Sequence, residues 1–345
     1  MVFEGFPFIV GWELTLVCNL RCGHCASSAG LPRPNELSLE EALNICEQFP
    51  SLLVQEVDFT GGEPLVRRDW PQIAARLREL GIPVRMVTNG VLLEESVPAL
   101  VETGVATVAV SLDGLEATHD HIRRRSGLFK HITRGIEVAL AAGVPMAVIT
   151  AVNNRNVNDL PGLLRVIREL GVKHWQVQPT FPLGRAREGE ELGLSDACFL
   201  ELGEFIRARV AACEEDGIRM QPADGVGYFT SLDMRETPWR GCSAGIASCG
   251  ITSDGKIKGC LSHPDNLLEG DLRQRDLWDI WFDKDAFAYN RRFSVADLGE
   301  FCEGCEFGEQ CKGGCGVMSY AATGHFHNDP YCFHGICARS PRVEG

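Results

Sequence analysis

Cys18-Asn-Leu-Arg-Cys22-Gly-His-Cys25 places three thiols in one short loop, and Gly61-Gly62-Glu63-Pro64 follows about one βαβ unit later. Three thiolates can bind three irons of a four-iron, four-sulfur cluster and leave the fourth iron without a protein ligand. An open metal position is where a reactant binds, as it is in catalytic zinc sites. We therefore expect a cluster with one open iron here. A zinc site is the alternative, which three close thiols without a nearby fourth ligand fit poorly.

The composition is that of an ordinary globular protein, with 345 residues, 45% hydrophobic and 23% charged. A net charge of -14 and the lack of a basic tail argue against nucleic-acid binding. We find neither a signal peptide nor about 18 uninterrupted apolar residues, so we expect no membrane segment and a cytoplasmic location. In such a chain, most of the 15 cysteines are expected to bind metal rather than form disulfides.

Short β-branched segments alternate with helical patterns in the first half of the chain, which indicates a parallel sheet with crossover helices. One such helix follows Ser38-Leu-Glu-Glu41, which is a capping box. The strand spacing is roughly 30 residues, about six times over, so the sequence favours an α/β fold built on a partial (β/α)6 TIM-like barrel. A doubly wound sheet is the alternative. The predicted strands are residues 8–16, 54–60, 83–88, 106–112, 146–152 and 174–179.

Four polar loops follow predicted strands directly. Ligands gather at the carboxyl ends of parallel strands in either fold, so we expect these loops to meet at one mouth. The loops are Cys18 to Cys25, Gly61 to Glu63, Thr88-Asn89-Gly90 and Ser111-Leu-Asp113-Gly114.

The second half of the chain changes character twice. Residues 191–236 are mostly helical in pattern, with Ser195 as a plausible N-cap, and are expected to connect two domains. Residues 237–345 are rich in Gly and Cys, which indicates a small irregular domain stabilised by bound metal. We therefore divide the chain into a barrel at 1–190, a connector at 191–236 and a cysteine-rich domain at 237–345. Cys46, Cys198 and Cys213 lie in helical patterns and are expected to be buried hydrophobic residues.

The three-thiol loop followed by Gly61-Gly62-Glu63-Pro64 resembles the radical S-adenosylmethionine (SAM) superfamily. This resemblance implies that Cys18, Cys22 and Cys25 bind a [4Fe-4S] cluster whose open iron binds SAM. It also implies that an electron from the cluster cleaves SAM to a 5′-deoxyadenosyl radical, which abstracts hydrogen from a substrate.

The same resemblance assigns SAM contacts to loops at the barrel mouth. It places Gly61, Gly62 and Glu63 at the SAM ammonium group, and a carboxylate suits a cation. Thr88 and Asn89 resemble residues that bind the nucleoside. Ser111 and Asp113 resemble contacts of the ribose or the methionine end, and Arg123 resembles an arginine that pairs with the SAM carboxylate. Leu183 lies in a stretch that resembles the segment over the adenine, and His24 is expected to pack beside the cluster.

The cysteine-rich domain resembles the SPASM domain, which carries auxiliary iron-sulfur clusters. Eight cysteines are the number that two four-cysteine clusters need. The resemblance implies one auxiliary cluster on Cys242, Cys249, Cys260 and Cys315, and a second on Cys302, Cys305, Cys311 and Cys332. Cys337 competes with Cys332 for the last position, and two zinc knuckles are the alternative to two clusters.

SPASM proteins mostly modify peptides, so the resemblance implies a maturase that cross-links, oxidises or epimerises a ribosomally made peptide. It also implies an electron donor of the flavodoxin or ferredoxin type. A sulfatase-maturing enzyme is less favoured, since Leu261, Ser262 and His263 follow Cys260 where that group has an aspartate; His263 can in principle accept a proton. A radical enzyme of cofactor or haem biosynthesis is a second enzyme class that fits, and a non-catalytic electron carrier is far less favoured. The chain begins near its first strand, so leader binding would come from the barrel rim, a sheet edge or a separate peptide-recognition protein.

Overall fold

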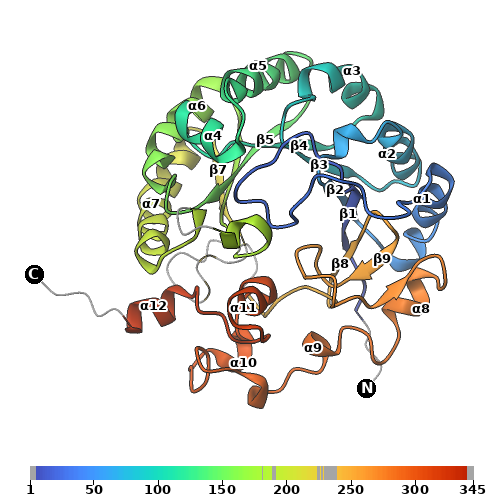
Figure 1. Ribbon diagram of the computed structural model, residues 1–345, viewed down its shortest axis with the longest axis vertical. Coiled ribbons are helices and arrows are strands. Elements are labelled where there is room, and N and C mark those ends of the chain that lie inside the picture. Colours follow the sequence, from blue (N-terminus) through green and yellow to red (C-terminus); the bar gives the residue numbers. More distant parts are fainter. Residues whose placement is uncertain are drawn as a thin grey trace, which may run out of the picture.

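A single ten-stranded sheet organises the chain in the computed structural model (Figure 1). The structure describes residues 5–180, 182–188, 192–223, 226, 228 and 239–339. The strand order is β10-β9-β8-β1-β2-β3-β4-β5-β6-β7. The strands are β1 (Ile9–Thr15), β2 (Glu56–Gly61), β3 (Val84–Thr88), β4 (Thr107–Ser111), β5 (Met146–Val152), β6 (His174–Pro179), β7 (Arg219–Pro222), β8 (Ser248–Ile251), β9 (Lys256–Lys258) and β10 (Gly270–Asp271).

Strands β1 to β6 confirm the six predicted strands and pair in parallel in chain order. They curve around a common centre with their helices outside, as a partial barrel does, and the loop after β1 (dark blue) crosses the barrel mouth (Figure 1). The predicted fold class is therefore confirmed, and the carboxyl ends of these strands face one mouth.

Four strands, β7 to β10, extend this sheet beyond the six that the sequence predicts. The segment assigned to the helical connector contains β7, which pairs in parallel with β6. The cysteine-rich part supplies β8, which pairs in parallel with β1 and places Cys249 opposite Val10. Barrel and cysteine-rich part thus share one sheet. The predicted domain limits near residues 190 and 236 lie outside the described residues.

Twelve α-helices lie in the described part of the chain. The Ser38 capping box and the Ser195 N-cap form as expected, at α1 and α7. The helices are α1 (Leu39–Cys46), α2 (Trp70–Glu79), α3 (Leu93–Thr103), α4 (Glu116–Arg123), α5 (Leu128–Ala141), α6 (Leu160–Leu170), α7 (Asp196–Glu215), α8 (Leu277–Trp281), α9 (Ala288–Arg291), α10 (Gly308–Cys311), α11 (Gly316–Thr323) and α12 (Phe333–Arg339). None of the helices in these ranges is both long and apolar enough to cross a membrane.

Successive side chains of β1 alternate between the hydrophobic core and the opposite face of the strand. Val10, Trp12 and Leu14 are fully buried, and Trp12 packs edge-on against Phe49 and Phe59, which stabilises the contact between sheet and helices. Successive side chains point to opposite faces, so Glu13 and Thr15 lie on the other face of the strand. On β1, the polar side chains therefore lie on the face of the strand that points away from this core.

Candidate functional site

The three cysteines of the first loop line one cavity of about 390 Å³ at the barrel mouth, which we call the thiol pocket. The pocket gathers ten of the residues predicted from sequence, and they come from the ends of strands that are far apart in the chain. These residues are Cys18, Cys22, Cys25, Gly61, Gly62, Thr88, Asn89, Ser111, Asp113 and Arg123.

Backbone contacts fix the loop that carries the thiols. Arg185 donates from Nε to the Cys22 carbonyl at 2.8 Å and from Nη1 to the Ala29 carbonyl at 3.1 Å.

Burial raises the pKa of the Cys22 thiol to about 11. Arg123 opposes this shift, and Asp113 and the thiols of Cys25 and Cys18 add to it. Metal binding would release protons from these thiols, and Arg123 lies where it would offset the resulting negative charge.

The Gly61–Gly62 turn lets the backbone approach this loop closely. A Cβ on Gly62 would lie 2.2 Å from the Val17 carbonyl oxygen, and a Cβ on Gly61, where φ is +142°, would lie 2.2 Å from that of Thr15. Only glycine fits at both positions. The turn therefore exposes backbone groups to the pocket next to the thiols, which suits a polar ligand held beside a cluster.

Glu63 is buried behind the pocket and is not part of its lining. Its carboxylate accepts hydrogen bonds from the Thr88 hydroxyl and the Asn89 backbone N–H, both at 2.7 Å. Burial raises its pKa to about 7, although these hydrogen bonds oppose the shift. Asn89 in turn donates from Nδ2 to Asn19 Oδ1 at 2.7 Å and faces Cys18 Sγ at 3.7 Å. Glu63 thus positions two residues that line the pocket.

Asp113 and Arg123 form a buried ion pair whose residues both line the pocket. Arg123 Nε and Nη2 lie 2.8 and 2.7 Å from Asp113 Oδ2, and His24 Nε2 lies 3.1 Å from the same oxygen. Burial would raise the pKa of Asp113, but Arg123 and His24 hold it well below its usual range. His24 therefore lies beside the cysteines and contacts a carboxylate.

A second cavity of about 460 Å³, which we call the side chamber, adjoins the thiol pocket. The two cavities share Ala26, Thr60, Gly61 and Ser262 in their linings. Leu183, which the sequence places over an adenine, lines the side chamber and not the thiol pocket. His263 also lines the chamber, and burial lowers its pKa to about 4, with Lys258 adding to the shift.

Sequence reasoning missed several residues of the mouth. Gln176 and Gln178 line the thiol pocket from β6, and Gln176 donates to Gln178 at 2.9 Å. Their alternation with the buried Trp175 and Val177 is the signal that could have identified them. Arg185 ends the stretch from Gln178 that resembles the segment over the adenine, whereas Ser262 carries no comparable signal, because it reaches the pocket from a distant loop.

Four of the C-terminal cysteines line a separate cavity of about 360 Å³, the second cysteine pocket. They are Cys302, Cys305, Cys311 and Cys332, the set predicted for one auxiliary cluster. Burial raises the pKa of the Cys311 thiol to about 12, and the nearby Cys332 thiol is the second-largest cause of this shift. Cys337 is exposed and does not line this cavity. Four thiols around one cavity are the donor set that a four-iron cluster needs.

The other predicted set is brought together only in part. A Cβ on Gly316, next to Cys315, would lie 3.5 Å from Cys242 Sγ, and Cys260 and Cys315 belong to one apolar cluster near α11. Cys249 belongs instead to the main core on β8. Burial raises its pKa to about 12, Arg291 opposes the shift, and no other thiol contributes. Across the described ranges, no three His, Cys, Asp or Glu side chains are arranged for a single metal ion.

Comparison with known proteins agrees with this arrangement. The sequence model of the Radical SAM superfamily matches residues 12–167, and that of the SPASM iron-sulfur cluster-binding domain matches residues 242–306. An AdoMet-dependent haem synthase of Methanosarcina barkeri is 32% identical over 95% of this chain and 97% of its own. The mycofactocin maturase MftC of Mycobacterium ulcerans is 28% identical over 96% of this chain and 89% of its own.

Among solved structures, SuiB of Streptococcus suis bound to S-adenosylmethionine superimposes with a TM-score of 0.79 at 19% identity, over 95% of this chain and 78% of that chain. This similarity shows the shared fold. The chain is therefore an enzyme of the radical SAM superfamily that carries a C-terminal SPASM domain.

Proposed function

We propose that the thiol pocket holds SAM on a [4Fe-4S] cluster bound by Cys18, Cys22 and Cys25, and that the side chamber holds the substrate. When bound, the cluster supplies the electron that cleaves SAM to methionine and a 5′-deoxyadenosyl radical, which removes a hydrogen atom from the substrate. The observation that carries this proposal is the lining that the two cavities share, because the radical must form within contact distance of the substrate.

The chain's own residues position SAM in this proposal. Gly61 and Gly62 expose the backbone, and Thr88 and Asn89, held by Glu63, offer polar groups for the ammonium and nucleoside. Arg123 offers positive charge for the SAM carboxylate, and Asp113 and Ser111 complete the polar lining. Leu183 contributes an apolar surface to the neighbouring chamber.

The auxiliary sites are proposed to carry two further clusters. The second cysteine pocket would hold one on Cys302, Cys305, Cys311 and Cys332. The other would use Cys242, Cys260 and Cys315; no other thiol contributes to the pKa shift of Cys249, in contrast to Cys22, and this argues against the predicted role of Cys249 as the fourth ligand. Electrons would come from a flavodoxin- or ferredoxin-type donor.

Two substrate classes have support. A carboxylate-bearing tetrapyrrole is favoured by the similarity to a haem synthase along almost the whole of both chains and by the cations Arg33 and Lys258 in the side chamber. A ribosomally made peptide, expected from the sequence, is supported by the similarity to the mycofactocin maturase. The chamber charges make the tetrapyrrole the first candidate and the peptide the second.

Anaerobic reconstitution with iron and sulfide, followed by SAM and dithionite, tests the proposal. Release of 5′-deoxyadenosine is the expected result, and stimulation by iron coproporphyrin III would support the tetrapyrrole. A chain with its full complement of iron that releases none would overturn the proposed function.

A further inference from the structure

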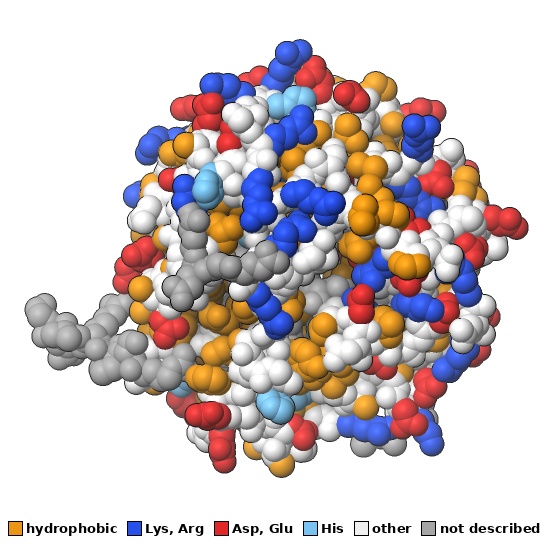
Figure 2. Space-filling model, in the orientation of Figure 1, with side chains coloured by type: hydrophobic (Ala, Val, Ile, Leu, Met, Phe, Trp, Pro, Cys, Tyr) orange, Lys and Arg blue, Asp and Glu red, His pale blue; other side chains and the backbone are white. Residues whose placement is uncertain are grey.

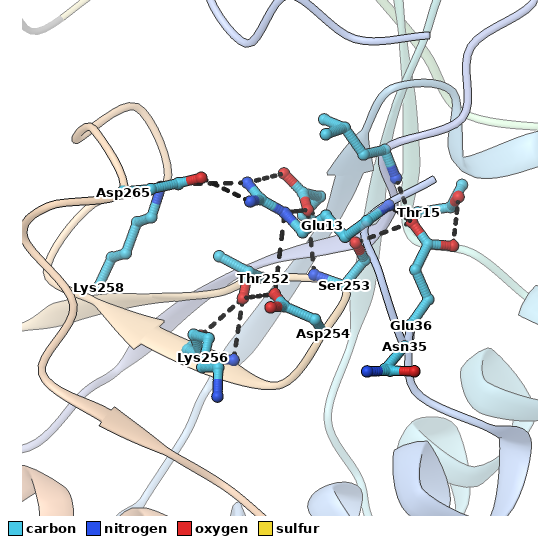
Figure 3. Close-up of polar contacts among 12 residues, drawn as sticks. Glu13, Thr15, Asn35, Glu36, Thr252, Ser253, Asp254, Lys256, Lys258 and Asp265 are labelled. Atoms are coloured by element: carbon cyan, nitrogen blue, oxygen red, sulfur yellow. Dashed lines mark hydrogen bonds and ion pairs between the residues drawn. The ribbon is translucent and has the colours of Figure 1, made fainter. Parts of the chain in front are cut away.

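The wall of the side chamber contains two cations that share one carboxylate (Figure 3). Arg33 comes from the loop between the cysteine loop and α1, and Lys258 ends β9. Their side chains are only 15% and 3% exposed. Asp265, from the loop between β9 and β10, lies between them and is 57% exposed. All three residues line the chamber.

The contacts of Asp265 are those of a carboxylate held in a binding site. Arg33 Nη1 lies 2.7 Å from Oδ2 and Nη2 lies 3.4 Å from Oδ1, while Lys258 Nζ donates to Oδ1 at 2.5 Å. Although burial opposes the shift, these two cations lower the pKa of Asp265. A guanidinium fork with an ammonium group beside it matches the shape and charge of a carboxylate.

The remaining contacts hold the two cations in place without Asp265. Glu13 accepts from Arg33 Nε at 2.6 Å and Nη2 at 3.2 Å, and Ser253 fixes Glu13 through its hydroxyl at 2.8 Å. Lys258 also donates to the His263 carbonyl at 2.8 Å. Glu13 therefore balances Arg33, whereas Lys258 depends on Asp265, its half-exposed partner on a loop, for a counter-charge.

We propose that Arg33 and Lys258 form a carboxylate-binding subsite of the side chamber, which Asp265 fills until a carboxylate of the substrate replaces it. This inference rests on the proposed function, because it takes the chamber as the substrate site. Lys and Arg side chains also gather around the middle of the face that carries the barrel mouth, although the net charge of the chain is -14 (Figure 2). An anionic substrate would be attracted to that face.

Binding of coproporphyrin III, a tetrapyrrole with four carboxylates, to the anaerobically reconstituted protein tests the subsite. Fluorescence titration of this acid and of its tetramethyl ester, in the same cosolvent, separates carboxylate recognition from apolar binding. We expect wild type to bind the acid more tightly than the ester. Lys258→Met should weaken binding of the acid by roughly tenfold and leave binding of the ester unchanged.

Lys256→Met is the matched control, because Lys256 lies on the same strand, pairs with Asp271 and does not line the chamber. It should leave both affinities unchanged. Asp265→Asn should strengthen binding of the acid several-fold, because it removes the internal competitor. If the ion pairs of Asp265 only stabilised its loop, Asp265→Asn would instead weaken binding of the acid.

A variant is compared with wild type only if its iron content and thermal unfolding match. Lys258→Arg, which keeps the positive charge, should bind the acid almost as tightly as wild type. Equal binding of acid and ester by wild type, or weaker binding by Asp265→Asn, would overturn the subsite. Release of 5′-deoxyadenosine by that same wild type would leave the proposed function standing, whereas its absence would count against the proposed function instead.

Discussion

Arg123 and Asp113 form an ion pair in which two guanidinium nitrogens lie 2.8 and 2.7 Å from one carboxylate oxygen, inside the pocket that holds the three N-terminal thiols. The pair joins the end of α4 to the loop after β4. It places one cation beside Cys22 and Cys18, where thiolates and a cluster would add negative charge. The second oxygen of Asp113 accepts from the Ala151 N–H at 3.0 Å, so the carboxylate also ties two strand ends together.

Asp113→Asn should therefore destabilise the protein strongly. Breaking a buried ion pair leaves Arg123 uncompensated, which typically costs about 3–5 kcal/mol in the free energy of unfolding. Anaerobic denaturant unfolding measures this loss. The matched control is Asp216→Asn, which removes the exposed partner of the exposed Arg168 and should cost less than about 1 kcal/mol. Equal losses in the two variants would contradict the role given to the buried pair.

Cys249→Ala should leave the iron content of the reconstituted protein unchanged, because no other thiol contributes to the pKa shift of Cys249. Cys260→Ala should remove the iron of one cluster. Iron analysis with Mössbauer spectroscopy of the two variants checks this difference. If Cys249→Ala loses as much iron as Cys260→Ala, the thiol is a ligand and the sequence-based set of four is right.

Cys332→Ala and Cys337→Ala should differ for a related reason. Cys332 lines the second cysteine pocket, whereas Cys337 is exposed and lies outside its lining. The first variant should lose one cluster and fold less stably, since bound metal contributes folding energy. Cys337→Ala should match wild type in iron content and thermal unfolding. A loss of iron in this variant would show that Cys337 competes for the site.

Stability should depend on pH through Glu63. Its pKa is raised from 4.5 to about 7 by burial, so the folded state favours the protonated form. The stabilisation is fully present below the unfolded value and is lost as the pH rises through about 7. The free energy of unfolding should fall by up to about 1.4 kcal/mol per pH unit between those values. Glu63→Gln should lack this component, and parallel pH profiles for the two proteins would contradict it.

The fold was predictable where its signals are local. Each of the six barrel strands alternates or runs apolar over five to seven residues, and the carboxyl ends of parallel strands must meet, so the sequence alone places Thr88, Asn89, Ser111 and Asp113 together. The glycine turn at Gly61 was predictable because the motif and the strand end coincide.

The remainder depends on pairings between distant segments. β8 joins the barrel strands through its pairing with β1, and the register of this pairing directs the Cys249 side chain into the core. The spacing of cysteines along the chain cannot predict the direction of a side chain. In the carboxylate-binding subsite, Arg33 pairs with Asp265, which lies 232 positions away along the chain, and neither residue belongs to a motif. Glu63 is a third case, since its residue type suggests ligand binding, whereas its hydrogen bonds to Thr88 and Asn89 depend on the pairing of β2 with β3.

The central claim is that the three N-terminal thiols leave one iron open for SAM. Electron-nuclear double resonance of the reduced, reconstituted protein with SAM labelled at the methionine nitrogen and carboxylate tests it directly. We predict hyperfine coupling of both labels to the cluster, and loss of that coupling in Cys22→Ala. Bound SAM without coupling, or a fourth side chain on that iron, would contradict the account.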